Sequence, residues 1–260
     1  MDAAAQHIPL SEGWEAVIYR EWEFPLEIIE SWDSLVKHYG DIGIFISYGW
    51  FENWWKAFGK KGELFIVVLM KNKETKAIFP CSIRNNGHGD YIASLTNDHT
   101  CYYNFIIEPA VRQMSLEKFV QVLQKTYPDA QPYFEYMETQ SDNFISLTNE
   151  LRSKRISAHK GSDPWSPWLR VSGDWMEFYN QLPGRLKNTL KRCRKKAEGQ
   201  GKLRFEIIQK SEQLDKALGD LFEVEYKSWK GRDGTAIKCQ KDVETFYRLF
   251  AHWSMQNNHL

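Results

Sequence analysis

Residues 64–84 read LFIVVLMKNKETKAIFPCSIR, with an apolar run on either side of a polar turn. The runs at residues 64–70 and 76–84 have the length of strands, and residues 71–75 are polar enough to form the turn between them. The stretch therefore predicts a β-hairpin.

The segment before this hairpin predicts one strand and two helices. The strand is expected at residues 16–22. Apolar residues at helical spacing then indicate a helix that ends near Gly40. A second helix begins at Ser47, and Gly59 and Gly62 stop it.

The segment after the hairpin alternates strands with helices. The expected elements are strands at residues 91–95 and 103–107 around a loop at residues 96–102, a helix around residues 116–123, a strand at residues 133–137, and a helix that Asp142 caps and that runs through Leu151. This order predicts an α/β protein of the α+β kind, with a mixed sheet.

Residues 156–171 contain two Pro and two Trp residues, a combination that resists helix formation. We interpret them as an extended crossover into a second half. The domain boundary is placed near Ser172, which gives domains at residues 1–171 and 172–260.

The second half is expected to begin with a helix that Ser172 or Asp174 caps. Pro183 and Gly184 bend this helix into a second, strongly basic one. Residues 203–208 then have the composition of a strand.

Two more helices are expected before the sequence ends, and Trp229 is assigned to the first of them. The second half thus starts like the first, but the chain ends at Leu260, before a second sheet could be completed. We therefore expect a complete first half and a partial second half, because the chain is a fragment or because a partner completes it.

The basic helix concentrates positive charge in a chain whose formal net charge is zero. Its apolar residues recur on one narrow stripe, which predicts a helix docked on a core with its cations turned outward. These cations would bind a nucleotide-type cofactor, a nucleic acid or an anionic lipid surface, or would form a solvated face. The stripe consists of Leu186, Leu190, Cys193 and Ala197, and the cations are Arg185, Lys187, Lys191, Arg192, Arg194, Lys195 and Lys196.

The composition is that of a globular protein, with 260 residues of which 42% are hydrophobic and 26% charged. The N-terminus lacks the basic and apolar regions of a signal peptide, and no apolar run is long enough to span a bilayer. We expect a cytoplasmic protein without a transmembrane segment. The four Cys residues lack paired spacing, so we expect neither a metal site nor a disulfide framework.

Two clusters of polar and aromatic residues are candidates for catalysis and substrate binding. Asp98, Tyr102 and Tyr103 lie in or next to the expected loop and could act as base and acid, although Asp98 and Asn97 could also form an Asx-type turn while the tyrosines pack. Trp229, Lys230 and Arg232 could line an acceptor cleft or simply end a helix.

The order of elements resembles that of the GNAT-superfamily acetyltransferases associated with bacterial cellulose and exopolysaccharide synthesis. Residues 166–208, SPWLRVSGDWMEFYNQLPGRLKNTLKRCRKKAEGQGKLRFEII, and the later EVEYKSWKGRDG carry the most specific part of the resemblance. It covers the chain from about Trp14 onward and implies two GNAT-like halves in tandem. Fem-type transferases, which use aminoacyl-tRNA, share a similar tandem arrangement.

The resemblance implies acetyl-CoA or another acyl-CoA as co-substrate, held by a glycine-containing turn between a strand and a helix. Residues 84–89, RNNGHG, match that pattern but precede a strand, which favours a hairpin turn. Residues 198–201, EGQG, follow a helix and are expected to terminate it. The resemblance places the better cradle beyond Leu260.

Three functions follow as hypotheses. The first is an acyl-CoA-dependent N-acyltransferase that acts on a small-molecule or glycan-precursor amine, linked to polysaccharide or envelope synthesis. The second is a Fem-type transferase whose basic helix contacts tRNA. The third is a noncatalytic binding or assembly module. The sequence does not determine the oligomeric state.

Overall fold

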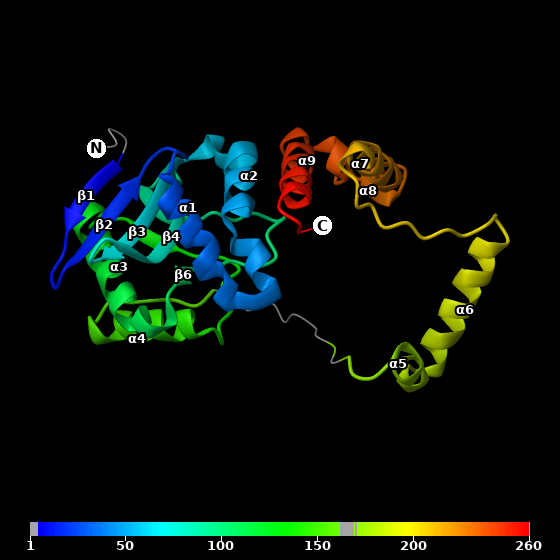
Figure 1. Cartoon of the computed structure of the whole chain (residues 1–260), viewed down its shortest axis with the longest axis horizontal. Coiled ribbons are helices and arrows are strands. Elements are labelled where there is room, and N and C mark those ends of the chain that lie inside the picture. Colours follow the sequence, from blue (N-terminus) through cyan, green and yellow to red (C-terminus); the bar gives the residue numbers. More distant parts are fainter. Residues whose placement is uncertain (1–4, 162–168, 170, 260) are drawn as a thin grey trace. The chain divides into compact units, whose positions relative to one another are not determined.

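The computed structural model describes residues 5–161, 169 and 171–259. The chain divides into two compact units, and Figure 1 labels most of their elements. Unit 1 combines Met1–Ala158 with Gln209–Leu260, and unit 2 is His159–Ile208. The domain boundary predicted near Ser172 divides the sequence into two successive folding domains. This division stays a prediction.

Unit 1 is built on a sheet of seven described strands in the order β1-β2-β3-β4-β5-β7, with β6 paired to β4. All pairs are antiparallel except β5 with β7, so the predicted mixed sheet is confirmed. The strands are β1 Ala5–Pro9, β2 Trp14–Tyr19, β3 Glu63–Lys71, β4 Glu74–Asn85, β5 Asp90–Ser94, β6 Ile106–Ile107 and β7 Gln131–Tyr133. Strand β1 was not predicted.

The hairpin predicted at residues 64–84 is the pair β3–β4, in which Val67 faces Phe79. Its turn needs a left-handed backbone at Asn72 and Lys73, whose φ angles are 52° and 69°. The central residues of both strands are buried, which explains why their sequences read as continuous apolar runs.

Strands β5 and β6 lie along the same edge of β4, and residues 95–105 leave the sheet between them. Ser94 pairs with Cys81, and Ile106 pairs with Ile78 only three positions further along β4. The strand predicted at residues 103–107 is therefore limited to β6. The intervening residues form a loop that carries the predicted catalytic cluster.

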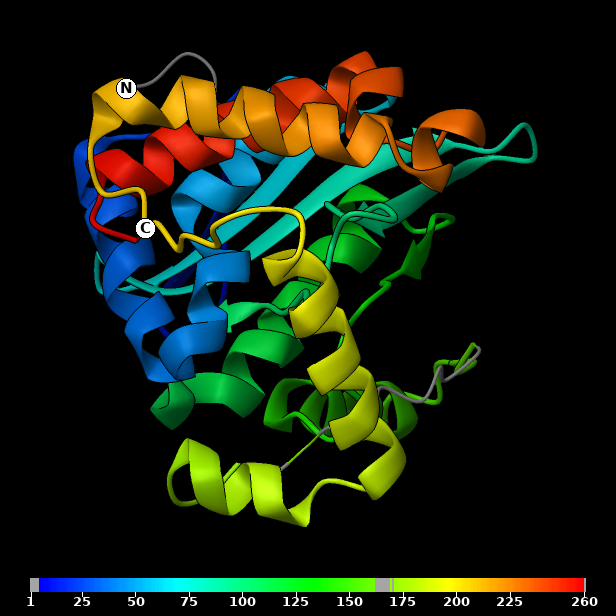
Figure 2. The ribbon, with the colours of Figure 1, turned by 90° about the vertical axis from the view of Figure 1, so that its right-hand side faces the viewer.

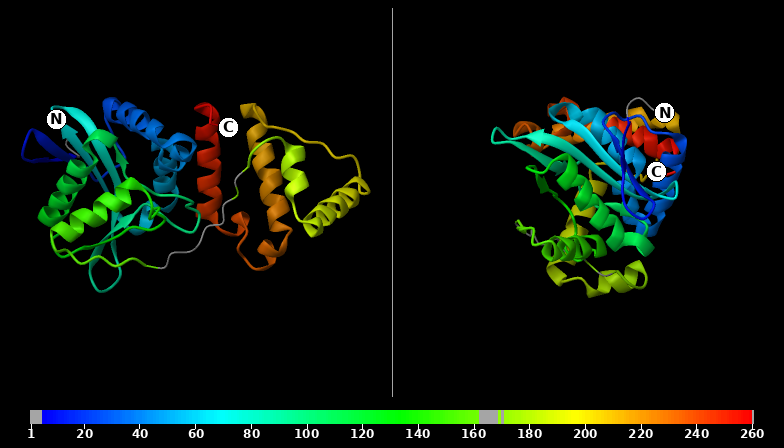
Figure 3. Two further views of the ribbon diagram at one scale, coloured as in Figure 1. Left: turned by 90° about the horizontal axis from the view of Figure 1, so that it is seen from below. Right: turned by 90° about the vertical axis from the view of Figure 1, so that its left-hand side faces the viewer.

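The helices cover both faces of this sheet. Figure 3 shows α3 and α4 on one face and α1 and α2 on the other. Phe119 of α3 stacks on Phe79 of β4, with ring centroids 3.9 Å apart. The helices of unit 1 are α1 Leu26–Val36, α2 Tyr48–Phe58, α3 Arg112–Thr126, α4 Asp142–Ser153, α7 Ser211–Tyr226, α8 Trp229–Arg232 and α9 Lys241–Gln256, with 3₁₀ segments at Lys37–Ile46, Gly59–Lys61, Pro109–Val111 and Ile237–Cys239.

Helix α9 packs directly on α2, although the two are far apart in the sequence. The ring of Trp50 meets those of Phe246 and Phe250 at centroid distances of 5.1 and 4.8 Å. Gly49 allows this approach, because a Cβ atom there would lie 1.9 Å from the ring of Trp253. Figure 2 shows α9 beside α7. Helix α9 therefore contributes Phe246 to the same core as the sheet.

Two helix ends differ from the sequence-based predictions. Ser141, not Asp142, caps α4, because its hydroxyl accepts the hydrogen bond from the Phe144 N–H at 3.3 Å. Trp229 does not continue α7, since α7 ends at Tyr226 and Ser228 caps the separate helix α8. The predicted caps Ser47 of α2 and Asp174 of α5 are confirmed.

Unit 2 contains α5 Trp175–Gln181 and the basic helix α6 Gly184–Glu198. The strand predicted at residues 203–208 is wrong for the described structure, where this segment has no strand beside it. A strand needs a hydrogen-bonded neighbour, and the described part of unit 2 supplies none. The expected extended crossover at residues 156–171 lies partly outside the described residues.

None of the described helices is long and apolar enough to cross a bilayer. The cytoplasmic location stays a prediction.

Candidate functional site

A cavity of about 320 Å³ in unit 1 lies between the loop after β5 and the start of α9. Two carboxylates, one lysine and one imidazole give it a polar lining. The lining residues are Phe58, Asn97, Asp98, His99, Gln240, Lys241, Asp242 and Val243.

The loop contains an Asx-type turn at Asn97. Its side-chain oxygen accepts the His99 N–H at 3.0 Å, and its own N–H donates to the Thr100 hydroxyl at 3.1 Å. The turn therefore depends on Asn97 rather than Asp98. Asp98 is exposed, and within the described chain its carboxylate has no hydrogen bond or ion pair.

His99 lines the cavity, and its surroundings change its pKa. Its ring lies parallel to that of Phe58 at a centroid distance of 6.3 Å, and its Nδ1 is 3.4 Å from the Tyr247 hydroxyl. Partial burial lowers the pKa of His99, although the nearby Asp98 and Glu225 carboxylates oppose the shift. The imidazole is therefore neutral at pH 7 and able to accept a proton.

The turn from α7 into α8 forms a charged wall beside His99. Glu225 accepts hydrogen bonds from the Lys230 ammonium and, at 2.8 Å, from the Ile237 N–H. The hydrogen bond from Lys230 lowers the pKa of Glu225. Lys230 thus lies near the predicted catalytic loop, whereas Trp229 and Arg232 are exposed and do not line the cavity.

Tyr102 and Tyr103 point away from the cavity into the core. Tyr103 is completely buried, and its hydroxyl donates to the Pro80 carbonyl at 2.8 Å. The Tyr102 hydroxyl accepts a hydrogen bond from the Asn104 side chain at 2.7 Å. Burial raises the pKa of both phenols. In this conformation neither tyrosine lies beside Asp98 in the cavity.

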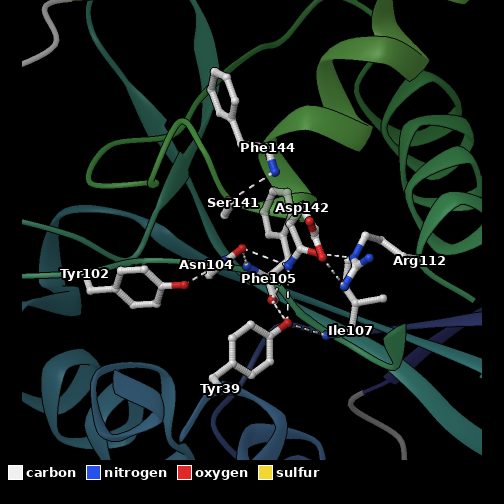
Figure 4. A network of polar contacts seen from close by, with 10 residues as sticks. Tyr39, Tyr102, Asn104, Phe105, Ile107, Arg112, Ser141, Asp142 and Phe144 are labelled. Atoms are coloured by element: carbon white, nitrogen blue, oxygen red, sulfur yellow. Dashed lines mark hydrogen bonds and ion pairs between the residues drawn. The ribbon is translucent and has the colours of Figure 1, made fainter. Parts of the chain in front are cut away.

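A polar network occupies the edge of β6 that faces away from β4, the described strand with which β6 pairs (Figure 4). The Tyr39 hydroxyl donates to the Phe105 carbonyl at 2.8 Å and accepts the Ile107 N–H at 3.2 Å. The Asn143 amide donates to the Phe105 carbonyl at 2.9 Å and to the Asn104 side chain at 2.8 Å. Protein side chains therefore satisfy this backbone edge, which leaves it closed to a ligand.

Replacing Asn143 with alanine is expected to reduce the free energy of unfolding by about 1–3 kcal/mol, because the buried groups around it lose their donor. Urea denaturation measures the change. The matched control is Asn149→Ala in the same helix, where the side chain is exposed and the effect should stay below about 0.5 kcal/mol. Equal stability of the two variants would contradict the structural role of the network.

The two glycine-containing candidates for a phosphate cradle both have other roles. Residues 84–89 connect β4 to β5, with Asn85 paired to Asp90, so the predicted hairpin turn is confirmed. Residues 198–201 begin at the last residue of α6, and the Gly199 N–H donates back to the Lys195 carbonyl. Neither segment opens a helix, so neither fits the pyrophosphate of coenzyme A in the way the pattern requires.

The basic helix α6 is not docked on a core, which corrects the prediction from its apolar stripe. Leu186 and Leu190 are 43% and 39% exposed, and no residue of the helix is buried. All its cations except the partly covered Lys187 are exposed. The Arg194 guanidinium pairs with Glu198 at 2.8 Å. An anion-binding role for the seven cations stays a prediction.

The comparison with protein families gives one match. Residues 184–260 match the acetyltransferase (GNAT) domain. The mixed α/β fold with its mostly antiparallel sheet is consistent with a GNAT-like fold. No curated protein and no solved structure matches the chain.

The sequence predicted catalytic residues in this loop, but it did not indicate which distant residues contact them. His99 stands beside Asp98 in the cluster, yet nothing in the sequence indicates that its ring meets Phe58 and Tyr247, residues from two distant helices. Nothing in the sequence distinguishes Glu225 from the other charged residues of its helix. The described residues contain no group of three or more His, Cys, Asp or Glu side chains that could hold a metal ion.

Proposed function

We propose that the protein is an N-acyltransferase that moves an acyl group from acyl-CoA, such as acetyl-CoA, to an amine. The observation that carries the proposal is the match of residues 184–260 to the acetyltransferase (GNAT) domain. Part of the matched segment, including Lys230 and Tyr247, surrounds His99 of the predicted catalytic loop. The cavity therefore combines a neutral base, His99, with residues of the segment that matches the acetyltransferase domain.

The chemistry needs an uncharged amine next to a thioester. Asp98 and Asp242 attract the ammonium form of the acceptor to the cavity, and His99 takes one proton from it. The amine nitrogen then attacks the carbonyl carbon, a C–N bond forms, and the C–S bond breaks. The leaving thiolate takes the second amine proton, which yields an amide and free coenzyme A.

The other predicted site residues have smaller parts in this proposal. Lys230, held by Glu225, fixes the turn beside His99, while the exposed Trp229 and Arg232 offer a surface for the rest of the acceptor. Tyr102 and Tyr103 are left out because they are buried away from the cavity. A glycan-precursor acceptor and a link to polysaccharide synthesis rest on the resemblance of residues 168–234 alone.

The test is release of free thiol from acetyl-CoA by the 260-residue chain in the presence of a panel of primary amines. Calorimetric titration with acetyl-CoA accompanies it. We expect binding of acetyl-CoA and amine-dependent thiol release above the rate without protein. Absence of both binding and turnover would overturn the proposal.

Replacing Asp98 with asparagine is expected to raise the KM for the amine by about two- to fivefold, as for an exposed ion pair, with unchanged affinity for acetyl-CoA. Initial rates over a range of amine concentrations measure the change. Asp129→Asn, which removes an exposed carboxylate outside the cavity, is the matched control. An equal effect of both variants would exclude a local role for Asp98.

A further inference from the structure

Unit 2 has no hydrophobic core in its described part. None of the described residues of His159–Ile208 is buried, although several are large and apolar. The exposed apolar residues of this unit are Leu169, Val171, Trp175, Met176, Leu186, Leu190, Leu203, Phe205 and Ile207. Apolar side chains in such number need a surface that covers them.

The strongest exposure occurs just after the basic helix. Phe205 is 99% exposed and Ile207 is 84% exposed, while Arg204 and Glu206 between them pair with each other at 2.7 Å. The segment is therefore extended. Its charged side chains Arg204 and Glu206 pair with each other, whereas the apolar side chains Phe205 and Ile207 are exposed to solvent. A solvated loop would not require apolar residues to alternate with charged ones in this way.

The same region carries a large positive charge. Residues 184–208 contain nine Lys and Arg but only two acidic residues, Glu198 and Glu206, which gives a formal charge of +7. On α6 the cations border the apolar stripe, with Lys187 and Arg194 on one side of it and Lys196 on the other. Long cationic side chains next to apolar ones can keep their charges at an interface while the stripe is buried.

We propose that α5, α6 and residues 203–207 form a docking surface for an anionic lipid bilayer. In the bound state α6 lies in the plane of the headgroups, Phe205 and Ile207 enter the apolar boundary, and the cations contact lipid phosphates and carboxylates. A nucleic acid would match the cations but would leave the aliphatic side chains uncovered. Only a partner that is both anionic and apolar satisfies the whole surface.

The experiment measures sedimentation of the full chain with vesicles of phosphatidylcholine alone and of phosphatidylcholine with about 30% phosphatidylserine. We expect binding to the anionic vesicles that weakens as salt rises. Arg194→Glu/Lys196→Glu, which changes one cation on each side of the stripe, should weaken it by about thirtyfold or more, because each Lys or Arg near the surface contributes about a fivefold change in affinity. Lys73→Glu/Lys125→Glu, with the same change of net charge on exposed residues of unit 1, is the matched control.

A second variant separates lipid from nucleic acid. Phe205→Ser/Ile207→Ser should weaken vesicle binding by at least tenfold, and these exposed side chains can be changed without loss of core packing. Retention of tRNA is measured in parallel. The proposal is overturned if anionic vesicles do not bind, if binding is indifferent to Phe205 and Ile207, or if tRNA binds tightly while the vesicles do not.

Discussion

Replacing His99 with glutamine is expected to lower kcat for acyl transfer by about 10²–10⁴-fold, the usual contribution of a positioned general base. Glutamine keeps a polar side chain at the cavity but cannot take up a proton. The physical reason for choosing His99 is its environment, since burial against Phe58 lowers its pKa and keeps the ring neutral at pH 7.

The pH profile gives this prediction a second readout. In the unmodified protein kcat/KM should rise with pH and level off above the pKa of His99, which lies below its ordinary value of 6.5. The glutamine variant should lose that inflection. Tyr247→Phe, which keeps the ring but removes the hydroxyl near Nδ1, should retain it. An unchanged rate and profile in the glutamine variant would remove His99 from the mechanism.

The same pKa shift has a consequence for stability. A histidine whose pKa is lower in the folded state binds fewer protons there than in the unfolded state, so stability is lost as pH falls from 6.5 toward the folded pKa. The glutamine variant should lose less stability over that range than the unmodified chain. Thermal unfolding at several pH values tests this sign.

The sequence predicts best where local pattern and tertiary structure agree. The hairpin β3–β4 combines continuous apolar runs with a short polar turn, and Ser47 and Asp174 carry the side chains that N-caps require. These features are encoded within a few residues of each other. Their prediction therefore did not depend on knowing which elements are neighbours.

The predictions fail where an element depends on a distant partner. Residues 203–208 have the composition of a strand, but the described unit offers no strand to pair with them. The stripe on α6 looked like a docking face, yet Leu186 and Leu190 remain substantially exposed. Periodicity indicates that a face is apolar, but it does not supply the surface that covers it.

The candidate site shows the same limit. Asp98 could be selected because acid, imidazole and phenols cluster in one loop, but Tyr102 and Tyr103 in that cluster turn inward to Asn104 and Pro80. Neighbours in a loop can point in opposite directions, and only packing determines which way. The residues that complete the cavity come from the start of α9, more than a hundred positions away in the sequence.

Replacing Phe246 with alanine is expected to reduce the free energy of unfolding by about 3–5 kcal/mol, the usual cost of removing a buried aromatic ring. Phe246 is completely buried, and its ring meets Trp50 at 5.1 Å and Phe58 at 5.5 Å. The variant leaves a void where α9 crosses α2. Because Phe58 also supports His99, the loss should reach the cavity as well as the core.

Urea denaturation followed by tryptophan fluorescence measures the loss, with Leu221→Ala as the control, since Leu221 lies on α7 and is 58% exposed. The control should change stability by less than about 1 kcal/mol. A single cooperative transition shifted to lower urea in Phe246→Ala would mean that α9 and the sheet unfold together. If only a small early transition moved and the main one stayed in place, α9 would be an independent element, and the cavity would not be part of the core that the sheet supports.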